Sequence, residues 1–300
     1  MHISDNWGEL LLPGLRTIFD KHLKKGKDFL SVIYNTENST KAQEFNLGVG
    51  ELGEMVEWDA SGRQVSYETF NKGFKATYTH KKYSKGVEVE RELVDDDLYG
   101  EIKKRVRKLS RVVYYTTQSH AVLPFNNAFG GILGPDAKPL CSATHPIMPG
   151  SATVWSNAGT WILSAKRVED TRNLMKQWVD DKGNLLMIDP DTIIVPVSLR
   201  KTAQIIAETA NEPFTTDYGV NVWKGNLNVI EWPFLTDQNT WFLVDMQRMK
   251  DYLNWYWRRR PDFADKVDFD TEVAKYKVIG RWSYGWDDAS FLYGHTGTVA

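Results

Sequence analysis

Cys141 and His145 carry the side chains that come nearest to a reactive pair in this sequence. They lie four residues apart in a stretch rich in Gly and Pro, where a thiol and an imidazole could act as nucleophile and base or as two metal ligands. A structural zinc ion needs about four ligands, and no second pair is at hand because Cys141 is the only cysteine and the 6 histidines are scattered. We therefore expect no metal site, no cofactor and no catalytic residue. A hydrolase with a site near Cys141 and His145 is kept as the enzymatic alternative.

Sequence motifs of common enzyme classes are absent as well. No G-x-S-x-G, P-loop or complete dinucleotide fingerprint occurs, and the run "GVGELG" at 48–53 stops short of the next required glycine. The adjacent acids at 180–181 and 287–288 are expected in turns rather than as general acid and base. These absences favour a structural role, and we predict that the protein is not an enzyme.

Basic side chains gather in "IKKRVRKLSR" at 102–111 and in "RRR" at 258–260, where they could contact phosphate groups. The whole chain has 37 Lys and Arg against 39 Asp and Glu, a formal charge of -2, which argues against a dedicated nucleic-acid-binding protein. Any contact with a polyanion must therefore be local. For the first run, the favoured alternative is a solvated helix face that complements Glu101 and the acidic segment before it.

A long amphipathic helix is expected to carry the first basic run. Its apolar residues recur at spacings of four, four, three and four, as a helical stripe requires; they are Leu98, Ile102, Val106, Leu109 and Val113. The acids at 95–97 can cap the first amides, and Pro124 is expected to end the helix. The roughly 27 residues from 97 to 123 would form a rod of about 40 Å.

Strict alternation of side chains just before this helix predicts a β-hairpin. Residues 74–81 and 87–93 would be its strands and "YSKG" at 83–86 its turn, with Lys82 opposite Val87 and Lys81 opposite Glu88. A two-stranded ribbon is marginal alone in water. We therefore expect it to project from the start of the helix and to lie against another molecule, with packing on its own domain as the alternative.

The remaining segments predict a compact α/β section between an irregular arm and a strand-rich tail. Residues 35–56 have few periodic hydrophobes and are predicted to be irregular. Buried strands are predicted in "DTIIVPVS", "LNVIEWPF" and "TWFLVDM", helices near Val168 and Leu199, and tail strands in "YKVIGRWSYGW" and "SFLYGH". The single cysteine points to a reducing cytosol, and neither a signal peptide nor a run of about 18 apolar residues is present.

This order of elements resembles the major capsid proteins of tailed bacteriophages, whose fold is named after the Hong Kong ninety-seven phage and is shared by herpesvirus shells. The sequence is similar in particular to the major head subunits of Mu-like phages. The similar stretches are "YETFNKGFKATYTHKKYSKGVEVERELVDDDLYGEI", "RNLMKQWVDDKGNLLMIDPDTIIVPVSL", "WPFLTDQNTWFLVDM" and the loop "SATHP" at 142–146. The resemblance covers residues 65–250.

The resemblance implies an α+β fold with an N-terminal arm at 1–53 and an extended loop, a β-hairpin, at 54–95. A peripheral domain with the spine helix would occupy 96–139 and 246–300, and an α/β axial domain 140–245. It also implies a structural head protein that self-assembles into hexamers and pentamers of an icosahedral shell enclosing double-stranded DNA. The virion would be assembled in the bacterial host cytoplasm, with scaffold and portal proteins, a decoration protein and non-specifically bound DNA as partners, and with no membrane.

Two sets of residues are expected to serve these roles. The candidates for DNA contact on the helix are Lys104, Arg107, Lys108 and Arg111. The candidates for contact between subunits are residues of the extended loop: Tyr67, Phe70, Phe74, Tyr78, Lys81, Tyr83, Glu88 and Glu90. The 12 Trp, 13 Tyr and 13 Phe are more rings than a core of this size readily hides, which favours protein interfaces. An aromatic-rich binding module of another virion part is the non-enzymatic alternative.

Overall fold

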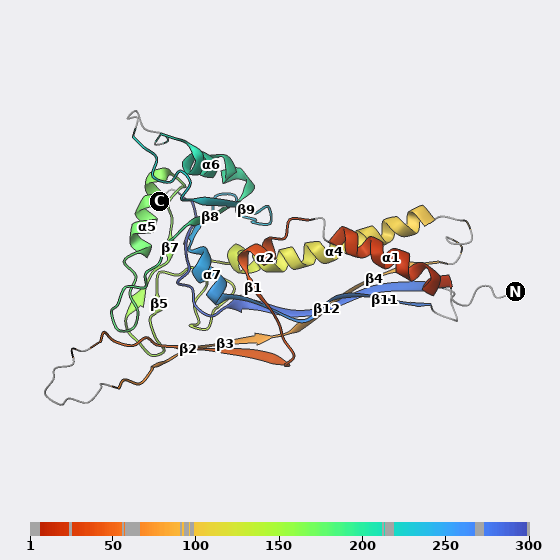
Figure 1. Cartoon of the computed structure of the whole chain (residues 1–300), viewed down its shortest axis with the longest axis horizontal. Helices are drawn as coiled ribbons and strands as arrows, with labels where there is room; N and C mark the ends of the chain where they lie inside the picture. Colours follow the sequence, from red (N-terminus) through yellow and green to blue (C-terminus); the bar gives the residue numbers. More distant parts are fainter. Residues whose placement is uncertain are drawn as a thin grey trace.

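The computed structural model describes residues 7–23, 26–55, 57, 67–90, 92, 96, 99–211, 213, 219–267 and 273–298. They form an α+β fold, as predicted. One part is elongated, with helices lying along a four-stranded sheet, and the other is built around a five-stranded sheet (Figure 1). A two-stranded ribbon runs along the side of the four-stranded sheet that faces away from α4 (Figure 1).

The helices are α1 (Trp7–Leu23), α2 (Phe29–Ile33), α4 (Tyr99–Asn126), α5 (Ala165–Met175), α6 (Arg200–Glu208) and α7 (Met246–Tyr252), with a 3₁₀ turn at Val197–Leu199. The strands are β1 (Asn35–Asn38), β2 (Gln43–Val49), β3 (Lys72–Thr79), β4 (Lys81–Val89), β5 (His145–Pro146), β6 (Val154–Trp155), β7 (Ala158–Gly159), β8 (Thr192–Val195), β9 (Asn228–Glu231), β10 (Trp241–Val244), β11 (Leu253–Val267), β12 (Ala274–Trp286) and β13 (Leu292–His295). Within the described ranges, no helix combines the length and the apolar character needed to cross a membrane.

The long helix α4 confirms the predicted amphipathic spine. Its stripe is buried against Phe19 of α1 and against Phe263 and Tyr276 of the sheet beneath; the buried members are Ile102, Val106, Leu109 and Val113. Leu98 lies outside the described residues. Pro124 does not end the helix, which continues to Asn126, because the burial of Phe125 outweighs one missing backbone hydrogen bond.

The four-stranded sheet, called here the spine sheet, has the order β1-β11-β12-β4. β11 and β12 form a long antiparallel hairpin with irregular register between Trp257 and Asp262, and β1 adds to β11 in parallel. α1 and α4 cover one face of this sheet (Figure 1). Beneath α4, the Tyr83 ring stacks on Trp282 with 4.3 Å between centroids, and Trp282 Nε1 donates a hydrogen bond to His120 Nδ1 of α4.

The five-stranded sheet has the order β7-β13-β10-β8-β9. β8 and β10 are buried along their whole length, as their apolar runs predicted. The strands predicted at β9, β12 and β13 are also present. The tail was predicted to return to the peripheral domain, but its strands belong to both sheets. β11 and β12 lie in the spine sheet, whereas the last strand, β13, pairs with β10 in the five-stranded sheet. β11, to which the sequence pattern assigned no strand, is the 15-residue strand of the tail.

The predicted hairpin at 74–93 is wrong. Residues 81–89 form a single strand, β4, that pairs with β12, so that Tyr83 lies opposite Gly280 and Glu88 opposite Lys275. β3 pairs instead with β2, and only His80 separates β3 from β4. The Tyr83 ring stacks on Trp282, so residues 83–86 continue the extended strand β4 instead of forming the predicted turn. This segment therefore packs on its own chain.

The predicted irregular arm at 35–56 is also wrong in its first part. Residues 35–38 and 43–49 form β1 and β2, because each finds a partner strand far along the chain. The structure therefore moves the extended ribbon toward the N-terminus, to β2 and β3.

Candidate assembly surfaces

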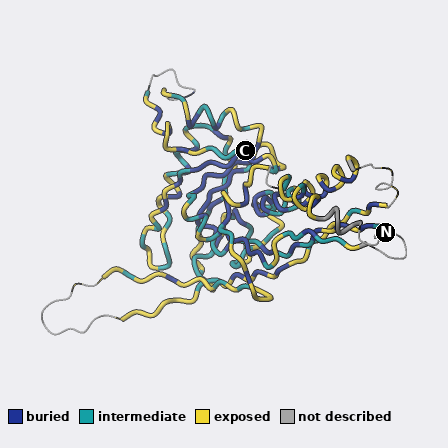
Figure 2. Tube along the Cα trace, turned by 45° about the vertical axis from the view of Figure 1, so that its right-hand side comes forward, coloured by how far each residue is buried: buried dark blue, intermediate teal, exposed yellow. Residues whose placement is uncertain are grey.

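The ribbon, defined here as β2, β3 and the described residues between them in 43–79, exposes an apolar stripe. Phe45, Leu47 and Val49 alternate along β2 and are 52%, 56% and 60% exposed. Lys75 lies opposite Leu47 on the same face, with its Nζ 4.3 Å from the centre of the Phe45 ring. The two strands are exposed along most of their length (Figure 2). The ribbon therefore presents an apolar stripe that the described chain leaves more than half exposed.

The opposite face of the ribbon is anchored to the body at its root. Asp287, just after β12, accepts hydrogen bonds from Tyr78 Oη at 2.5 Å and from Asn46 Nδ2 and Asn254 Nδ2 at 2.8 Å. Desolvation raises the pKa of Asp287 above its usual value, although these hydrogen bonds act in the opposite direction. Burial beside this carboxylate also raises the pKa of Tyr78, which keeps its hydroxyl protonated as a donor.

A second anchor holds the ribbon further out. Asp181 accepts hydrogen bonds from the backbone N–H of Glu51 at 2.9 Å and from Asn71 Nδ2 at 3.0 Å. Partial desolvation raises the pKa of Asp181, but the hydrogen bonds from Glu51 and Asn71 outweigh it and leave the pKa lowered. Lys182 Nζ also lies 3.5 Å from Glu68. In this structure the ribbon thus lies along its own five-stranded part.

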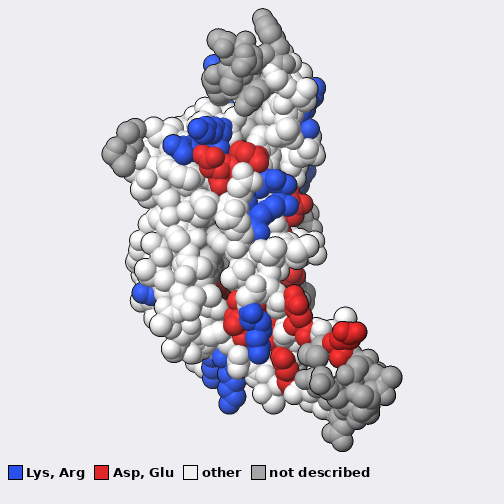
Figure 3. All heavy atoms as spheres, turned by 90° about the vertical axis from the view of Figure 1, so that its left-hand side faces the viewer, with Lys and Arg blue, Asp and Glu red and all other residues white. Residues whose placement is uncertain are grey.

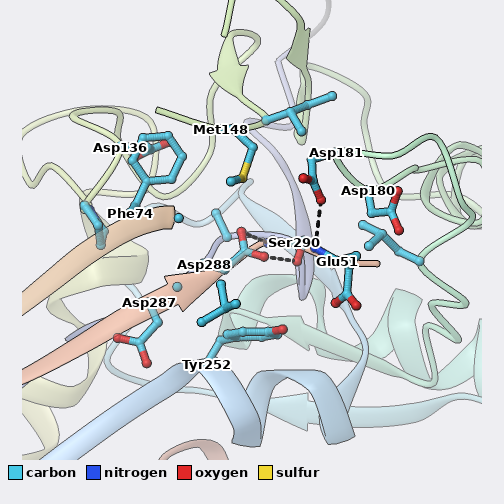
Figure 4. A pocket seen from close by; sticks show the side chains of 18 of the residues that line it. Glu51, Phe74, Asp136, Met148, Asp180, Asp181, Tyr252, Asp287, Asp288 and Ser290 are labelled. Atoms are coloured by element: carbon cyan, nitrogen blue, oxygen red, sulfur yellow. Dashed lines mark hydrogen bonds between the residues drawn. The ribbon is translucent and has the colours of Figure 1, made fainter. Parts of the chain in front are cut away.

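A groove of about 340 Å³ separates the ribbon from that part. Phe74 and Met148 lie on its walls, and carboxylates of Glu51, Asp180 and Asp288 surround it (Figure 4). Acidic side chains also follow the lower part of the molecular face seen in Figure 3. Among the described residues, no three His, Cys, Asp or Glu side chains are grouped so that they could hold a metal ion.

The predicted basic face of α4 lines a groove of about 760 Å³ together with Tyr114 and Tyr115. Lys104 pairs with Glu101 at 2.5 Å. Arg107, Lys108 and Arg111, in contrast, form no ion pair within the part of the chain that the structure describes, although the charge of Lys108 contributes to lowering the pKa of Glu101. Local charge compensation, the alternative considered from the sequence, therefore accounts for Lys104 and in part for Lys108, but for neither arginine among the described residues.

The eight predicted contact residues do not form one surface. Tyr67 and Phe70 are exposed on the ribbon, and Phe74 is half-buried beside the groove. Tyr78 is buried at the root and Tyr83 is stacked under α4, so neither is free to contact another subunit. The other three are exposed on β4 or just beyond it; they are Lys81, Glu88 and Glu90.

The sequence reasoning missed the stripe of Phe45, Leu47 and Val49. Its signal was present, because apolar residues at every second position in "EFNLGV" are typical of a strand with one apolar face. The surrounding Asn, Ser, Thr and Gly residues hid that short pattern.

The Cys141 and His145 side chains are both buried in the interior of the protein. Burial raises the pKa of the Cys141 thiol, which disfavours the reactive thiolate. His145 is buried, with Nδ1 2.5 Å from Asp136 Oδ2 and Nε2 3.0 Å from Asn157 Oδ1, and its ring stacks on Trp155. Among the described contacts, no hydrogen bond joins the thiol to the imidazole. This loop therefore lacks the geometry of a nucleophile and its base.

A sequence profile and solved structures both relate this chain to phage capsid proteins. A sequence profile described as phage capsid protein matches residues 75–294. A search of curated proteins found no match. A chain of the bacteriophage JBD30 procapsid is similar with a TM-score of 0.55 and 16% identity, covering 99% of this chain and 77% of that one.

Two further phage structures resemble the chain to a similar degree. A chain of the JBD30 capsid decorated with minor capsid protein trimers has a TM-score of 0.56 and 14% identity, over 71% of this chain and 92% of that one. A Mycobacterium phage Adephagia chain has a TM-score of 0.53 and 14% identity, over 92% of each chain. At these identities, the likeness establishes the tailed-phage capsid fold.

Proposed function

The chain belongs to the phage capsid protein family, and we propose that copies of it assemble as hexamers and pentamers into an icosahedral shell around double-stranded phage DNA. It is a structural protein of the capsid, with the major capsid protein fold of tailed phages. Membership of the Mu-like group, suggested by sequence resemblance, stays a prediction.

The observation that carries this proposal is the uncovered stripe of Phe45, Leu47 and Val49 on a projecting ribbon. A two-stranded ribbon is marginal alone in water. Covering the exposed half of each of these side chains would contribute roughly 1 kcal/mol per side chain. In a closed shell every copy can cover the ribbon of its neighbour, and the contacts summed around one subunit would exceed the roughly 1,600 Å² of a single specific interface.

We keep three of the four proposed parts, with shifted boundaries. The described residues of the proposed N-terminal arm at 1–53 are divided between the peripheral part and the extended loop, because α1 packs on α4, β1 pairs with β11 and β2 pairs with β3. We assign the extended loop to 43–79 and the spine helix with the spine sheet to the peripheral part. The axial part is the five-stranded sheet with α5 and α6, and it includes β13 from the tail. Of the eight predicted contact residues, Tyr67 and Phe70 keep their proposed role because they are exposed on the ribbon.

The basic face of α4 is proposed to line the DNA-filled interior. It lies on the helical side of the spine sheet, whereas the ribbon lies on the other side (Figure 1). The charges of Arg107, Lys108 and Arg111 would contact phosphate without reading sequence. A densely packed genome needs confinement more than tight binding, so three such charges per subunit suffice.

Scaffold, portal and decoration proteins are proposed as partners. The similar JBD30 structures are a procapsid and a capsid decorated with minor capsid protein trimers, which supports stepwise assembly with auxiliary proteins. We place assembly in the cytoplasm of the bacterial host and the final location in the virion. The role needs no catalytic step, and the packed state of Cys141 and His145 supports this.

Light scattering and negative-stain imaging of the purified chain, with and without its scaffold protein, test the proposal. Wild-type protein should form shells or capsomers, whereas Phe45→Ser with Leu47→Ser should remain monomeric with an unchanged circular dichroism spectrum. Val197→Ser is the matched control, because this valine is 51% exposed in the 3₁₀ turn just before α6. A wild-type chain that stays monomeric with scaffold present, or a stripe variant that assembles normally, would contradict the proposal.

A further inference from the structure

The ribbon joins the spine sheet through two short connections of the chain. One is residues 39–42, between β1 and β2, and the other is His80, between β3 and β4. β1 and β4 belong to the spine sheet, whereas β2 and β3 form the ribbon (Figure 1). His80 is only 5% exposed. A change in the direction of the ribbon relative to the spine sheet must therefore bend the chain at these two places.

A relay of hydrogen bonds ties both connections to β12 of the spine sheet. His80 Nε2 lies 3.0 Å from Ser39 Oγ, and His80 Nδ1 lies 2.9 Å from Ser283 Oγ of β12. Ser39 Oγ donates to Glu44 Oε1 of β2 at 2.7 Å and accepts a hydrogen bond from the backbone N–H of Lys41. Lys41 Nζ also pairs with Glu44 Oε2 at 2.9 Å. We call the side chains of Ser39, Glu44, His80 and Ser283 the His80 relay.

The order of donors in the His80 relay fixes which ring nitrogen carries the proton. An ionised carboxylate only accepts, so Ser39 gives its hydroxyl hydrogen to Glu44 and accepts from His80 Nε2. In a neutral ring the other nitrogen is an acceptor, and Ser283 therefore donates to Nδ1. The relay is complete for a neutral imidazole that is protonated on Nε2.

A second proton on the ring breaks this pattern. Nδ1 becomes a donor, so the buried Ser283 hydroxyl has to turn away and its hydrogen loses the acceptor that the described contacts provide. Burial lowers the pKa of His80, and the nearby charge of Arg281 lowers it further. Arg281 Nε donates to the His80 carbonyl oxygen at 3.3 Å. Arg258 acts in the same direction, and only the carboxylate of Glu44 favours the protonated ring.

We propose that the His80 relay is a proton-sensitive lock on the direction of the ribbon: the neutral ring holds both connections to β12, and protonation of Nδ1 releases them. The lock rests on the described contacts alone, whereas its effect on assembly rests on the proposed shell function. The folded pKa lies below the usual value of 6.5, so the lock contributes stability that is present above 6.5 and is lost as pH falls toward the folded pKa. The ribbon should be fixed at pH 7 and freer at pH 5.

The other titrating groups of the ribbon do not produce this response between pH 7 and pH 5. Acidification removes an unfavourable buried charge from Asp287, because its pKa is raised, and so does not loosen that anchor. The pKa values of Asp181 and Glu44 are lowered from 3.8 and 4.5, so both carboxylates stay ionised at pH 5. His295 also charges on acidification, but it lies in the five-stranded sheet. A response confined to the two connections therefore identifies His80.

Amide hydrogen–deuterium exchange of the full-length chain at pH 7 and pH 5, corrected for the intrinsic pH dependence of exchange, tests the lock. Protection of the amides in 39–44 and 77–84 should fall roughly tenfold at pH 5, because each pKa unit changes the equilibrium tenfold. His80→Gln should keep its protection at pH 5, because an amide side chain can donate and accept without titrating. His22→Gln, on α1, is the matched control and should retain the wild-type response.

Exchange of the imidazole C2 hydrogen, followed by mass spectrometry in the wild-type chain, gives an independent readout that needs no variant. His80 should titrate below 6.5, and its midpoint should coincide with that of the local loss of protection. Titration at or above 6.5, a loss of protection spread evenly over the chain, or a wild-type response in His80→Gln would each overturn the lock. These results leave the shell function standing, because assembly is tested at pH 7. A chain that never assembles at pH 7 refutes the shell function and leaves the lock to be decided by exchange.

Discussion

Replacement of Tyr78 by phenylalanine should loosen the ribbon at its root by removing one hydrogen bond. The Tyr78 hydroxyl donates to Asp287 over 2.5 Å, whereas its ring packs edge-on against Tyr256 with centroids 5.0 Å apart. Phenylalanine keeps the ring contact. A hydrogen bond to a charged group contributes about 1.5 to 3 kcal/mol. Asn46 and Asn254 still donate to the carboxylate, so we expect the free energy of unfolding to fall by about 2 kcal/mol.

The pH dependence of this loss follows from the raised pKa of Asp287. A carboxyl group whose folded pKa lies above its unfolded value contributes stability that is present below the unfolded pKa and is lost as pH rises through the folded pKa. At pH 7 the carboxylate is therefore an unfavourable buried charge that its three donors offset. The cost of Tyr78→Phe should be greater at pH 7 than near pH 4, where more of Asp287 is protonated.

Urea unfolding at both pH values measures this cost, and limited proteolysis of the ribbon reports whether the root has opened. Tyr67→Phe is the control, because Tyr67 is 89% exposed on the same ribbon. If Tyr78→Phe stayed within about 0.5 kcal/mol of wild type at pH 7, or lost as much at pH 4, the anchor at Asp287 would not have the role assigned to it.

Three further predictions concern other parts of the molecule. Burial lowers the pKa of His295 to about 3, so its contribution to stability is present above the unfolded pKa near 6.5 and is lost as pH falls toward the folded one. Urea titration should show a loss of about 2 kcal/mol between pH 7 and pH 5, and a protein whose stability does not change would refute this. In the spine, Ile102→Ala should cost about 2 to 5 kcal/mol because Ile102 is buried; Val112→Ala, at an exposed site on the same helix, should cost under about 1 kcal/mol, and equal costs would refute the packing. Replacing Arg107 and Arg111 by serine should reduce the salt slope of binding to random duplex DNA by about 0.9 per lost phosphate contact; an unchanged slope in fluorescence anisotropy would exclude these residues from the DNA surface.

The spine helix could be predicted from the sequence because its signal is local. Residues spaced at three and four positions must share one helix face whatever lies against it, so Ile102, Val106 and Leu109 were identified as a buried stripe in advance. The continuous apolar runs of β8 and β10 identified buried strands in the same way. Family resemblance then supplied the overall order of the parts, which local patterns do not contain.

Partner choice between strands was decided only by the tertiary structure. Alternation from Phe74 to Val89 correctly indicated extended chain, but the same alternation fits a hairpin or two strands in different sheets. Tyr83 stacks on Trp282 and Tyr78 donates a hydrogen bond to Asp287, and both partners lie in the tail of the chain. Such long-range contacts have no period, so no window of neighbouring residues reveals them.

The distribution of charge was likewise determined partly by the sequence and partly by the tertiary structure. The sequence by itself determined that the spine helix is basic and that the net charge is near zero. Only the strand register brought Arg259, Arg281 and Lys82 into one row, and only the pairing of β2 with β3 exposed Phe45, Leu47 and Val49 on one face. The physical reason is that side-chain periodicity is a relation between residues that are close in the chain. Charge repulsion and burial depend on which residues are close in space, and the sequence alone does not specify those neighbours.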